Sequence, residues 1–320
     1  MSQVRWILPP SVDHGAVREL SRQLGVSPLI GELLVRRGFS DAENAARFLD
    51  PKLKTLSDPY LLPDMNAAVG RILMAIDRRE RIVLYGDYDV DGVTSLALMT
   101  RVLRAYGIEP SRFLPHRMEE GYGLSSDGLA RCVEEHRPQL VIALDCGTAS
   151  VKEVRGLKEW EVDVIVVDHH EPQGELPPCD ALVNPKRGTD FHYLCTVGLA
   201  FKVAHALLKQ RSLPTFDLRN VLDLVALGSV ADIVPLVGEN RVLVRHGLLR
   251  IADSQWVGVR ALVDVAGVRA PISPGDVGFM LGPRLNAAGR LGTAQDALEL
   301  LLTEDRQRAC EIANHLDEQN

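Results

Sequence analysis

The stretch "LYGDYDVDGVTS", residues 84–95, holds three aspartates at alternate positions: Asp87, Asp89 and Asp91. Apolar residues flank this stretch on both sides, with "RIVLY" before it and "LALM" after it. Three carboxylates so close in sequence repel one another unless a positive charge lies between them. We therefore expect the three aspartates to surround a cation.

Three further polar clusters lie far along the chain from the first. Two follow apolar runs and one closes a helical pattern: Asp145 in "LDCGT", then Asp168, His169 and His170 in "VVDHH", then Asp232 in "GSVADIVPL". Any single cluster is explained as a helix cap or a solvated loop, where aspartate is common. Four clusters in one chain are hard to explain in this way, so we expect them to converge on one site.

The chemistry that these residue types suit is metal binding. Carboxylates with one or two imidazoles favour Mg²⁺ or Mn²⁺ over zinc, because oxygen ligands dominate. Cys146 lies next to Asp145, and we expect it to be a small buried apolar side chain rather than a ligand. The carboxylates exceed what one ion needs. Two ions about 3.5–4 Å apart, sharing a carboxylate, would use them, and this arrangement cleaves phosphoesters.

The pattern of apolar runs predicts the elements that bring these clusters together. Short runs without polar alternation are expected as buried strands at 81–85, 112–115, 140–145 and 163–168. Helical stretches at about 93–106, 126–136 and 149–160 separate them. This alternation predicts an α/β fold with a doubly wound, mostly parallel sheet and helices on both faces. Ligands bind beyond the carboxyl ends of such strands, which is where the clusters fall.

The domain organisation follows from where this alternation begins and ends. Residues 1–75 are expected to form a helical N-terminal segment packed on the core, and residues 76–250 the catalytic domain. Residues 251–320 are expected to form a helical and loop region that connects to a second domain absent from this chain. The last residues, "RQRACEIANHLDEQN", look like a continuing amphipathic helix without a C-cap glycine, which favours a truncated chain.

Bulk composition limits the class of protein. With 320 residues, 46% of them hydrophobic and 25% charged, the chain resembles an ordinary globular protein. No apolar run approaches the roughly 18 residues that span a membrane, so no membrane partner is expected. Five cysteines without a C-x-x-C pair favour reduced thiols in a cytoplasm. A net charge of −7 argues against nonspecific coating of nucleic acid but allows a local basic groove.

The motifs "GDYDVDG", "LDCG", "DHH" and "ADIVPL", in this order, resemble those of the DHH phosphoesterase superfamily. Further stretches resemble its RecJ-type family of bacterial single-strand-specific exonucleases: "RRGFSDAENAARFLDP", "PHRMEEGYGLS", "LVNPKR", "VGLAFK" and "GPRLNAAGRLG". The resemblance runs from about residue 5 to the end. It implies 5′→3′ release of mononucleotides from single-stranded DNA in recombination and repair. It also implies a single-strand-binding protein and a helicase as partners.

The resemblance implies a role for each clustered residue. One Mn²⁺ or Mg²⁺ ion would be held by Asp91, Asp145, His169 and Asp232. The second would be held by Asp89 and Asp145, with Asp87 near it directly or through water. Asp145 would then bridge the ions and His170 would contact the scissile phosphate, so the expected catalytic residues are His170, Asp145 and Asp87. Asp168 is expected to orient His169 or a neighbouring residue. Related pyrophosphatases carry a histidine where this chain has Tyr85, so we expect a weaker, more hydrated second metal site.

Six residues outside the clusters are candidates for binding the DNA strand: Arg284, Asn286, Arg290, Lys186, Arg187 and Ser125. Guanidinium groups suit phosphate recognition because their donors form a planar fork. The alternative is structural: the arginines would pair with surface acids, and Ser125 would cap the helix that follows it.

Three other functions fit parts of the sequence. "DVDGVT" matches the D-x-D-G-T pattern of haloacid-dehalogenase-like phosphatases, in which the first aspartate is a covalent nucleophile, but that pattern leaves "DHH" unexplained. A phosphodiesterase of the same superfamily acting on short oligonucleotides or cyclic dinucleotides is the nearest enzymatic alternative. A non-catalytic scaffold for DNA or replication proteins is the third, although every expected ligand position is filled.

Overall fold

The computed structural model of the protein describes residues 10–115, 123–291 and 294–320, the side chains of residues 290 and 291 excepted. The chain forms two compact units, one ending at Thr55 and the other running from Leu56 to Asn320. The sequence predicted a boundary after residue 75, but residue 75 lies inside α4 (Met65–Arg78). The reason is burial: α4 places Ala68, Val69 and Ile72 in the core of the larger unit, against α9 and β5.

The smaller unit contains three short helices: α1 (His14–Leu24), α2 (Pro28–Arg36) and α3 (Ala42–Leu49). Each begins after a side chain that accepts a hydrogen bond from an amide of the first turn: Asp13, Ser27 and Asp41. The three helices meet at a small apolar cluster built on Leu20, Leu34 and Ala45. This confirms the predicted helical character of the N-terminal segment.

The larger unit is built on a five-stranded parallel sheet in the order β2-β1-β3-β4-β5. The strands are β1 (Ile82–Gly86), β2 (Ser111–Phe113), β3 (Leu140–Leu144), β4 (Asp163–Val167) and β5 (Ala181–Val183). All residues of β1 and β3 are buried, which explains their unbroken apolar sequence. The predicted fold class is therefore confirmed. The edge strand β5 is too short to give a sequence signal and was not predicted.

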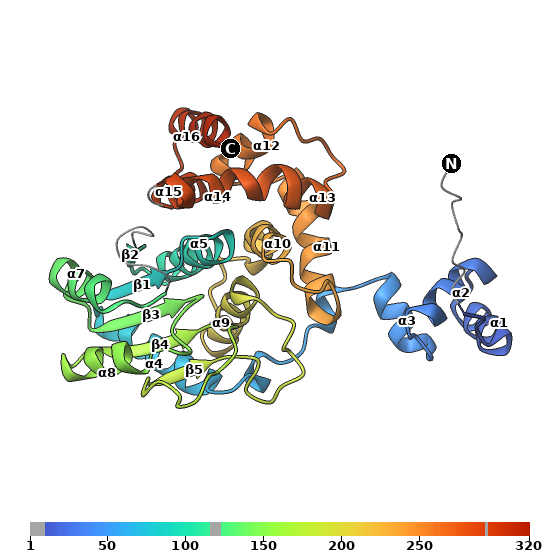
Figure 1. The fold of residues 1–320 in the computed structure, drawn as a ribbon, viewed down its shortest axis with the longest axis horizontal. Helices are drawn as coiled ribbons and strands as arrows, with labels where there is room; N and C mark the ends of the chain where they lie inside the picture. Colours follow the sequence, from blue (N-terminus) through green and yellow to red (C-terminus); the bar gives the residue numbers. More distant parts are fainter. Residues whose placement is uncertain (1–9, 116–122, 292–293) are drawn as a thin grey trace, which may run out of the picture. The chain divides into compact units, whose positions relative to one another are not determined.

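Helices cover both faces of this sheet (Figure 1). One face packs on α7 (Ser126–His136) and α8 (Val151–Glu159), where Leu129 and Leu157 join the core. Around the sheet lie α4, α5 (Val90–Ala105) and α9 (Thr196–Gln210), which contact β5, β1 and β4 respectively. The strands therefore end in loops enclosed by helices.

A buried helix completes the frame of the site. α10 (Leu222–Ala231) packs on α5, α9 and α11 (Gly238–Ala252), and every residue from Leu222 to Ser229 is buried. The short 3-10 turns η1 (Leu53–Thr55), η2 (Pro59–Leu61) and η3 (Leu218–Val221) lie in the connecting segments. Because α10 ends at Ala231, its packing fixes the position of Asp232, its C-cap residue.

The C-terminal residues form helices, as predicted for residues 251–320. They are α12 (Val257–Val265), α13 (Pro274–Asp276), the π-helical turn η4 (Val277–Leu281), α14 (Gly282–Leu291), α15 (Gln295–Leu302) and α16 (Arg306–Gln319). α14 and α15 contact α5, and α16 packs on α12, α14 and α15 (Figure 1). Among the described residues, none of the helices combines the length and the apolar sequence needed to cross a bilayer.

The contact between α10 and α11 yields a stability prediction. Gly247 of α11 lies so close to α10 that an added Cβ would meet the Leu222 carbonyl and lie 2.5 Å from Ala226 Cβ. Overpacking of this kind typically costs about 1–3 kcal/mol. We expect Gly247→Ala to lower the free energy of unfolding by that amount, measured by denaturant titration.

Gly70 provides the matched control, because it lies in α4 and its added Cβ would meet nothing within 4 Å. Gly70→Ala should stabilise the protein by about 0.5–1 kcal/mol through the higher helix propensity of alanine. Equal effects of the two substitutions would show that the α10–α11 contact is looser than described here.

Candidate metal centre at the carboxyl ends of the strands

Four predicted ligands surround one point. His169 Nε2 lies 3.4 Å from Asp145 Oδ1, 3.7 Å from Asp232 Oδ2 and 3.9 Å from Asp91 Oδ2. These residues come from four places: the ends of β3 and β4, the first turn of α5 and the C-cap of α10. The structure thus brings together the residues expected to hold the first ion.

A second group adjoins the first. Asp87, Asp89 and Asp145 each offer a carboxylate oxygen, and the three atoms lie within 4.8 Å of one another. Asp145 also belongs to a group of the same size with His169 and His170. Asp145 therefore belongs both to the ring around His169 and to the group with Asp87 and Asp89. This is the position expected of a ligand that bridges two ions.

The turn from β1 to α5 places the three aspartates. Asp89 is the N-cap of α5 and accepts a hydrogen bond from Gly92 N at 3.0 Å, while Asp87 accepts one from Tyr88 N at 2.7 Å. An added Cβ on Gly92 would lie 2.5 Å from Asp87 O, so glycine alone allows this close approach. Asp91 follows in the first helical turn and is buried.

Two residues of this region have left-handed backbones: Asp145, with φ 67°, and Ile233, with φ 59°. Ile233 directly follows Asp232, and its side chain is 89% exposed. A left-handed conformation is strained for a β-branched residue. Strained backbone therefore lies at or beside two of the ligands.

The first residues of α9 donate hydrogen bonds to two candidate ligands, Asp91 and Asp145. The sequence alone did not predict this role for α9. Asp91 Oδ2 accepts a hydrogen bond from Thr196 N at 2.7 Å, and Asp91 Oδ1 accepts one from Val197 N at 2.8 Å. Thr196 Oγ1 donates to Asp145 Oδ1 at 2.9 Å. "VGLAFK" marks this helix in the sequence, but nothing in its periodicity shows which carboxylates its first turn meets.

Burial and mutual repulsion disfavour the charged forms of these carboxylates. Desolvation, with the charges of Asp232 and Asp89, raises the pKa of Asp91 to about 8. Desolvation and the charge of Asp91 raise the pKa of Asp145 well above its usual value. Desolvation and the charge of Asp89 raise the pKa of Asp232 to about 6. A divalent cation would reverse these shifts, because it favours the ionised form of each group.

The donor set fits such a cation. Burial lowers the pKa of His169 to about 4, so its imidazole is neutral at physiological pH, the form that binds metals. Asp232 Oδ2 is buried and accepts no hydrogen bond from any residue that the structure describes. Carboxylate oxygens with one neutral imidazole are the ligands that suit Mn²⁺ and Mg²⁺.

Asp168 holds His170 rather than His169. His170 Nδ1 lies 2.7 Å from Asp168 Oδ1, and Asp168 Oδ2 accepts a hydrogen bond from Thr148 N at 3.0 Å. The hydrogen bond to Asp168 raises the pKa of His170. Burial would raise the pKa of Asp168, but its bonds to His170 and Thr148 lower that pKa to about 2. His170 is thus a partly exposed imidazole next to the centre, and its pKa is raised by the buried carboxylate that holds it.

Two other side chains near the site belong to the core. Tyr85, where the sequence comparison with pyrophosphatases implied a histidine, donates to Gly123 O at 3.2 Å and stacks on Phe113 with ring centroids 5.0 Å apart. Cys146 is buried, and desolvation raises the pKa of its thiol well above the usual value, as fits an apolar filler. Cys195, not considered from the sequence, lies within 4.8 Å of Asp91 and Asp232.

Three predicted DNA-binding residues have structural partners. Arg187 Nη1 donates to Asp64 Oδ2 at 2.6 Å, and Arg284 Nε donates to Asp317 Oδ1 at 2.8 Å. Ser125 caps α7 by accepting a hydrogen bond from Gly128 N at 3.1 Å. These contacts match the structural alternative, and a role in DNA binding stays a prediction for all three.

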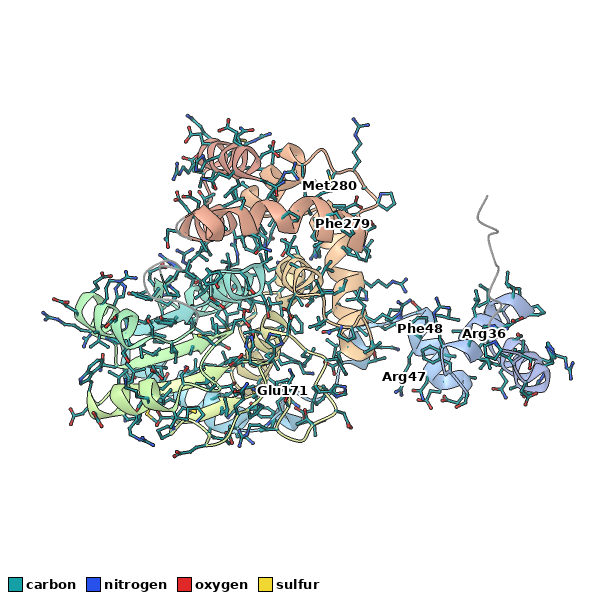
Figure 2. The ribbon with its side chains drawn as sticks, in the orientation of Figure 1. Arg36, Arg47, Phe48, Glu171, Phe279 and Met280 are labelled. Atoms are coloured by element: carbon teal, nitrogen blue, oxygen red, sulfur yellow. The ribbon has the colours of Figure 1, made fainter. Side chains whose placement is uncertain are left out.

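The other three are Lys186, Asn286 and Arg290. Lys186 Nζ lies 3.2 Å from Glu171 Oε1 (labelled in Figure 2). The charge of Lys186 contributes to the lowered pKa of His169 and partly offsets the rise in the pKa of Asp232. Asn286 and Arg290 lie on α14, although the side chain of Arg290 is outside the described residues. So are residues 116–122, most of the "PHRMEEGYGLS" stretch.

α14 passes beside the metal centre. An added Cβ on its Gly289 would lie 2.9 Å from Tyr88 O, between Asp87 and Asp89, and one on Gly282 would lie 3.4 Å from Ala231 Cβ, next to Asp232. The helix therefore joins the two ends of the site, with Asn286 between them.

Comparison with known proteins identifies the class. Residues 81–229, which contain the sheet and all the described ligands except Asp232, match the model of the DHH family, N-terminal domain. Residues 81–229 therefore belong to the DHH family.

Within that family, the chain is similar along its length to RecJ. It is 41% identical to the single-stranded-DNA-specific exonuclease RecJ of Bacillus subtilis, over 100% of this chain and 40% of that protein. It is 39% identical to RecJ of Thermus thermophilus, over 99% of this chain and 46% of that protein. The chain thus spans less than half the length of these two relatives.

Solved structures agree. The crystal structure of Thermus thermophilus RecJ in complex with Mn²⁺ matches 98% of this chain and 44% of that one, with a TM-score of 0.83 and 34% identity. A crystal structure of exonuclease RecJ bound to manganese matches 81% of this chain and 66% of that one, with a TM-score of 0.74 and 38% identity.

The shared position of Asp145 yields a second prediction. Asp145→Ala removes a carboxylate that belongs to both groups, so we expect it to abolish the binding of both ions and all activity. Isothermal titration calorimetry with Mn²⁺ measures the number of ions per chain. Asp264→Ala, which removes an exposed aspartate on α12, should leave that number unchanged. Two ions bound to the Asp145 variant would show that Asp145 is not the bridge.

Proposed function

We propose that this chain is a metal-dependent exonuclease. It hydrolyses phosphodiester bonds of single-stranded DNA in the 5′→3′ direction and releases 5′-mononucleotides, in DNA recombination and repair. The observation that carries the proposal is the ring of Asp91, Asp145, Asp232 and His169, next to a second carboxylate group that shares Asp145. The similarity to RecJ along the whole chain supports the choice of substrate.

The chain offers ligands for two Mn²⁺ or Mg²⁺ ions. Asp91, Asp145, His169 and Asp232 would hold one ion, and Asp89 and Asp145, with Asp87, would hold the other. When bound, the ions supply an activated water and neutralise charge on the phosphate. The site's own contribution is geometry, because α9 and the turn before α5 fix the carboxylates by hydrogen bonds.

His170 is the group placed to contact the phosphate. Its ring is 44% exposed, and Asp168 fixes its orientation through Nδ1. When protonated, it would stabilise the negative charge that grows on the phosphate oxygens in the transition state. Lys186 adds positive charge on the same side of the centre.

The activity named for the relatives also supports a proposal about the compartment and the partners of this protein. We infer that the enzyme acts in the cytoplasm, with a single-strand-binding protein and a helicase that supply the single strand.

Substrate choice tests the proposal. With Mn²⁺, the protein should release labelled 5′-mononucleotides from a long single strand at a higher kcat/KM than it cleaves a dinucleotide, and should leave the matching duplex intact. Affinity for the strand should fall only shallowly with salt, because Lys186, Arg187 and Arg284 already pair with carboxylates and leave few net phosphate contacts.

A higher kcat/KM on the dinucleotide would favour the alternative of a small-substrate phosphodiesterase. Strand binding without any cleavage, in protein shown to hold both ions, would favour the scaffold. Release of label from the 3′ end instead would contradict the proposed direction.

The two adjacent histidines should separate metal binding from catalysis. His169→Ala deletes an imidazole donor, so Mn²⁺ affinity should fall. His170→Ala should leave metal affinity nearly intact and lower kcat, typically by about 10²–10³ for one lost donor to the transition state. Calorimetry gives the affinities, and single-turnover cleavage gives the rates. Equal loss of metal in both variants would disprove this division of roles.

A further inference from the structure

We propose that the hydroxyl of Thr196 is a positioning group for the metal centre. It holds the carboxylate of Asp145 in the orientation needed to bind two ions. This inference rests on the proposed function, since it assigns Thr196 a role in the same two-ion site. Thr196 would act through Asp145 and would not itself contact an ion or the substrate.

The contact is direct and enclosed. Thr196 Oγ1 donates to Asp145 Oδ1 at 2.9 Å, and the exposed fractions of the two residues are 0% and 1%. The same Asp145 oxygen lies 3.4 Å from His169 Nε2. Asp145 Oδ1 therefore contacts the Thr196 hydroxyl and also lies next to His169 in the ring of candidate ligands. Among the described residues, Thr196 provides the one hydrogen bond to this carboxylate.

Thr196 also joins two ligands from different elements. Its backbone N–H donates to Asp91 Oδ2 at 2.7 Å, while its hydroxyl serves Asp145. Val197 N completes the set by donating to Asp91 Oδ1 at 2.8 Å. The first turn of α9 thus fixes a residue of α5 relative to the residue that follows β3. The positive end of the helix dipole also favours these carboxylates in their ionised form.

α9 is firmly anchored, so its first turn is a rigid support. Lys202, six residues further along α9, is fully buried, with Nζ 2.7 Å from Glu239 Oε2 and 2.9 Å from Ser57 O. These bonds tie α9 to α11 and to the segment before η2. A donor on such a helix holds the Asp145 carboxylate in place before any ion binds.

The consequence lies in preorganisation. Without the hydroxyl, the Asp145 carboxylate keeps its burial and its repulsion from Asp91 but loses its one fixed donor, so it is free to rotate. Loss of a hydrogen bond to a metal ligand typically costs about 10–100-fold in metal affinity. The effect should be largest on the state with two ions, because Asp145 is the residue that belongs to both groups of candidate ligands.

Thr196→Val tests the inference, because valine keeps the shape of threonine and removes the hydroxyl. Mn²⁺ titrations followed by electron paramagnetic resonance report both the free ion and the exchange-coupled signal of a carboxylate-bridged pair. We expect the variant to bind Mn²⁺ about 10–100-fold more weakly and to lose most of the coupled signal. Thr196→Ser, which keeps the hydroxyl, should restore both.

Thr100→Val is the matched control. Thr100 is buried in α5, about 13 Å along the helix from Asp91, and its hydroxyl has no hydrogen-bond partner in the described part of the chain. This variant should bind Mn²⁺ as the wild type does. Circular dichroism of the metal-free proteins checks the folding of each variant. If Thr196→Val fails to fold, Thr196→Ala removes the same hydroxyl and should show the same loss.

The outcomes separate this inference from the proposed function. In one outcome, the wild type shows the coupled signal and the Thr196→Val variant shows the same Mn²⁺ affinity and the same signal. This result would leave the proposed function standing and overturn the role of Thr196. A serine variant as weak as the valine variant would also overturn it, because packing and not the hydroxyl would then matter. A wild type that binds no Mn²⁺ pair would overturn both proposals.

Discussion

The repulsion among buried carboxylates is the constraint on which the rest of this structure depends. Asp91, Asp145 and Asp232 come from three different elements and lie around one imidazole nitrogen. Desolvation and their mutual charges raise the pKa values of all three. Such a cluster is unfavourable for folding unless donors and cations compensate it. The fold supplies donors from the first turn of α9, and a bound divalent cation would supply the rest of the compensation.

This constraint explains features that are costly on their own. α10 must approach α5 closely to bring Asp232 to Asp91, and Gly228 permits it: an added Cβ there would meet Thr94 Oγ1 and lie 3.2 Å from Asp91 Oδ1. Ile233 takes a left-handed backbone where the chain leaves α10. Packing of α10 against α5, α9 and α11 offsets the strain, since burial of apolar side chains is the largest favourable contribution in this region.

Much of the fold and of the site could be predicted because burial leaves a local signal in the sequence. The unbroken apolar runs located β1, β3 and β4, and the polar residues after them pointed to candidate ligands that the structure brings together. Contacts between distant segments leave no such signal. Thr196 meets Asp145 across 51 positions of sequence, and Arg284 meets Asp317 across 33. Neither pair follows from periodicity, because the packing of helices on the sheet decides which side chains meet.

The two histidines after β4 show how one short segment holds two imidazoles whose pKa values shift in opposite directions. His169 turns into the buried ring, where desolvation lowers its pKa to about 4 and keeps it a neutral donor. His170 is partly exposed, and its hydrogen bond to Asp168 raises its pKa. Asp168 is buried, and its bonds to His170 and Thr148 hold its pKa at about 2, although its charge still adds to the repulsion that raises the pKa of Asp145. The order Asp-His-His therefore places a buried carboxylate, a mostly buried neutral imidazole that is a candidate metal ligand, and a partly exposed imidazole in three consecutive residues.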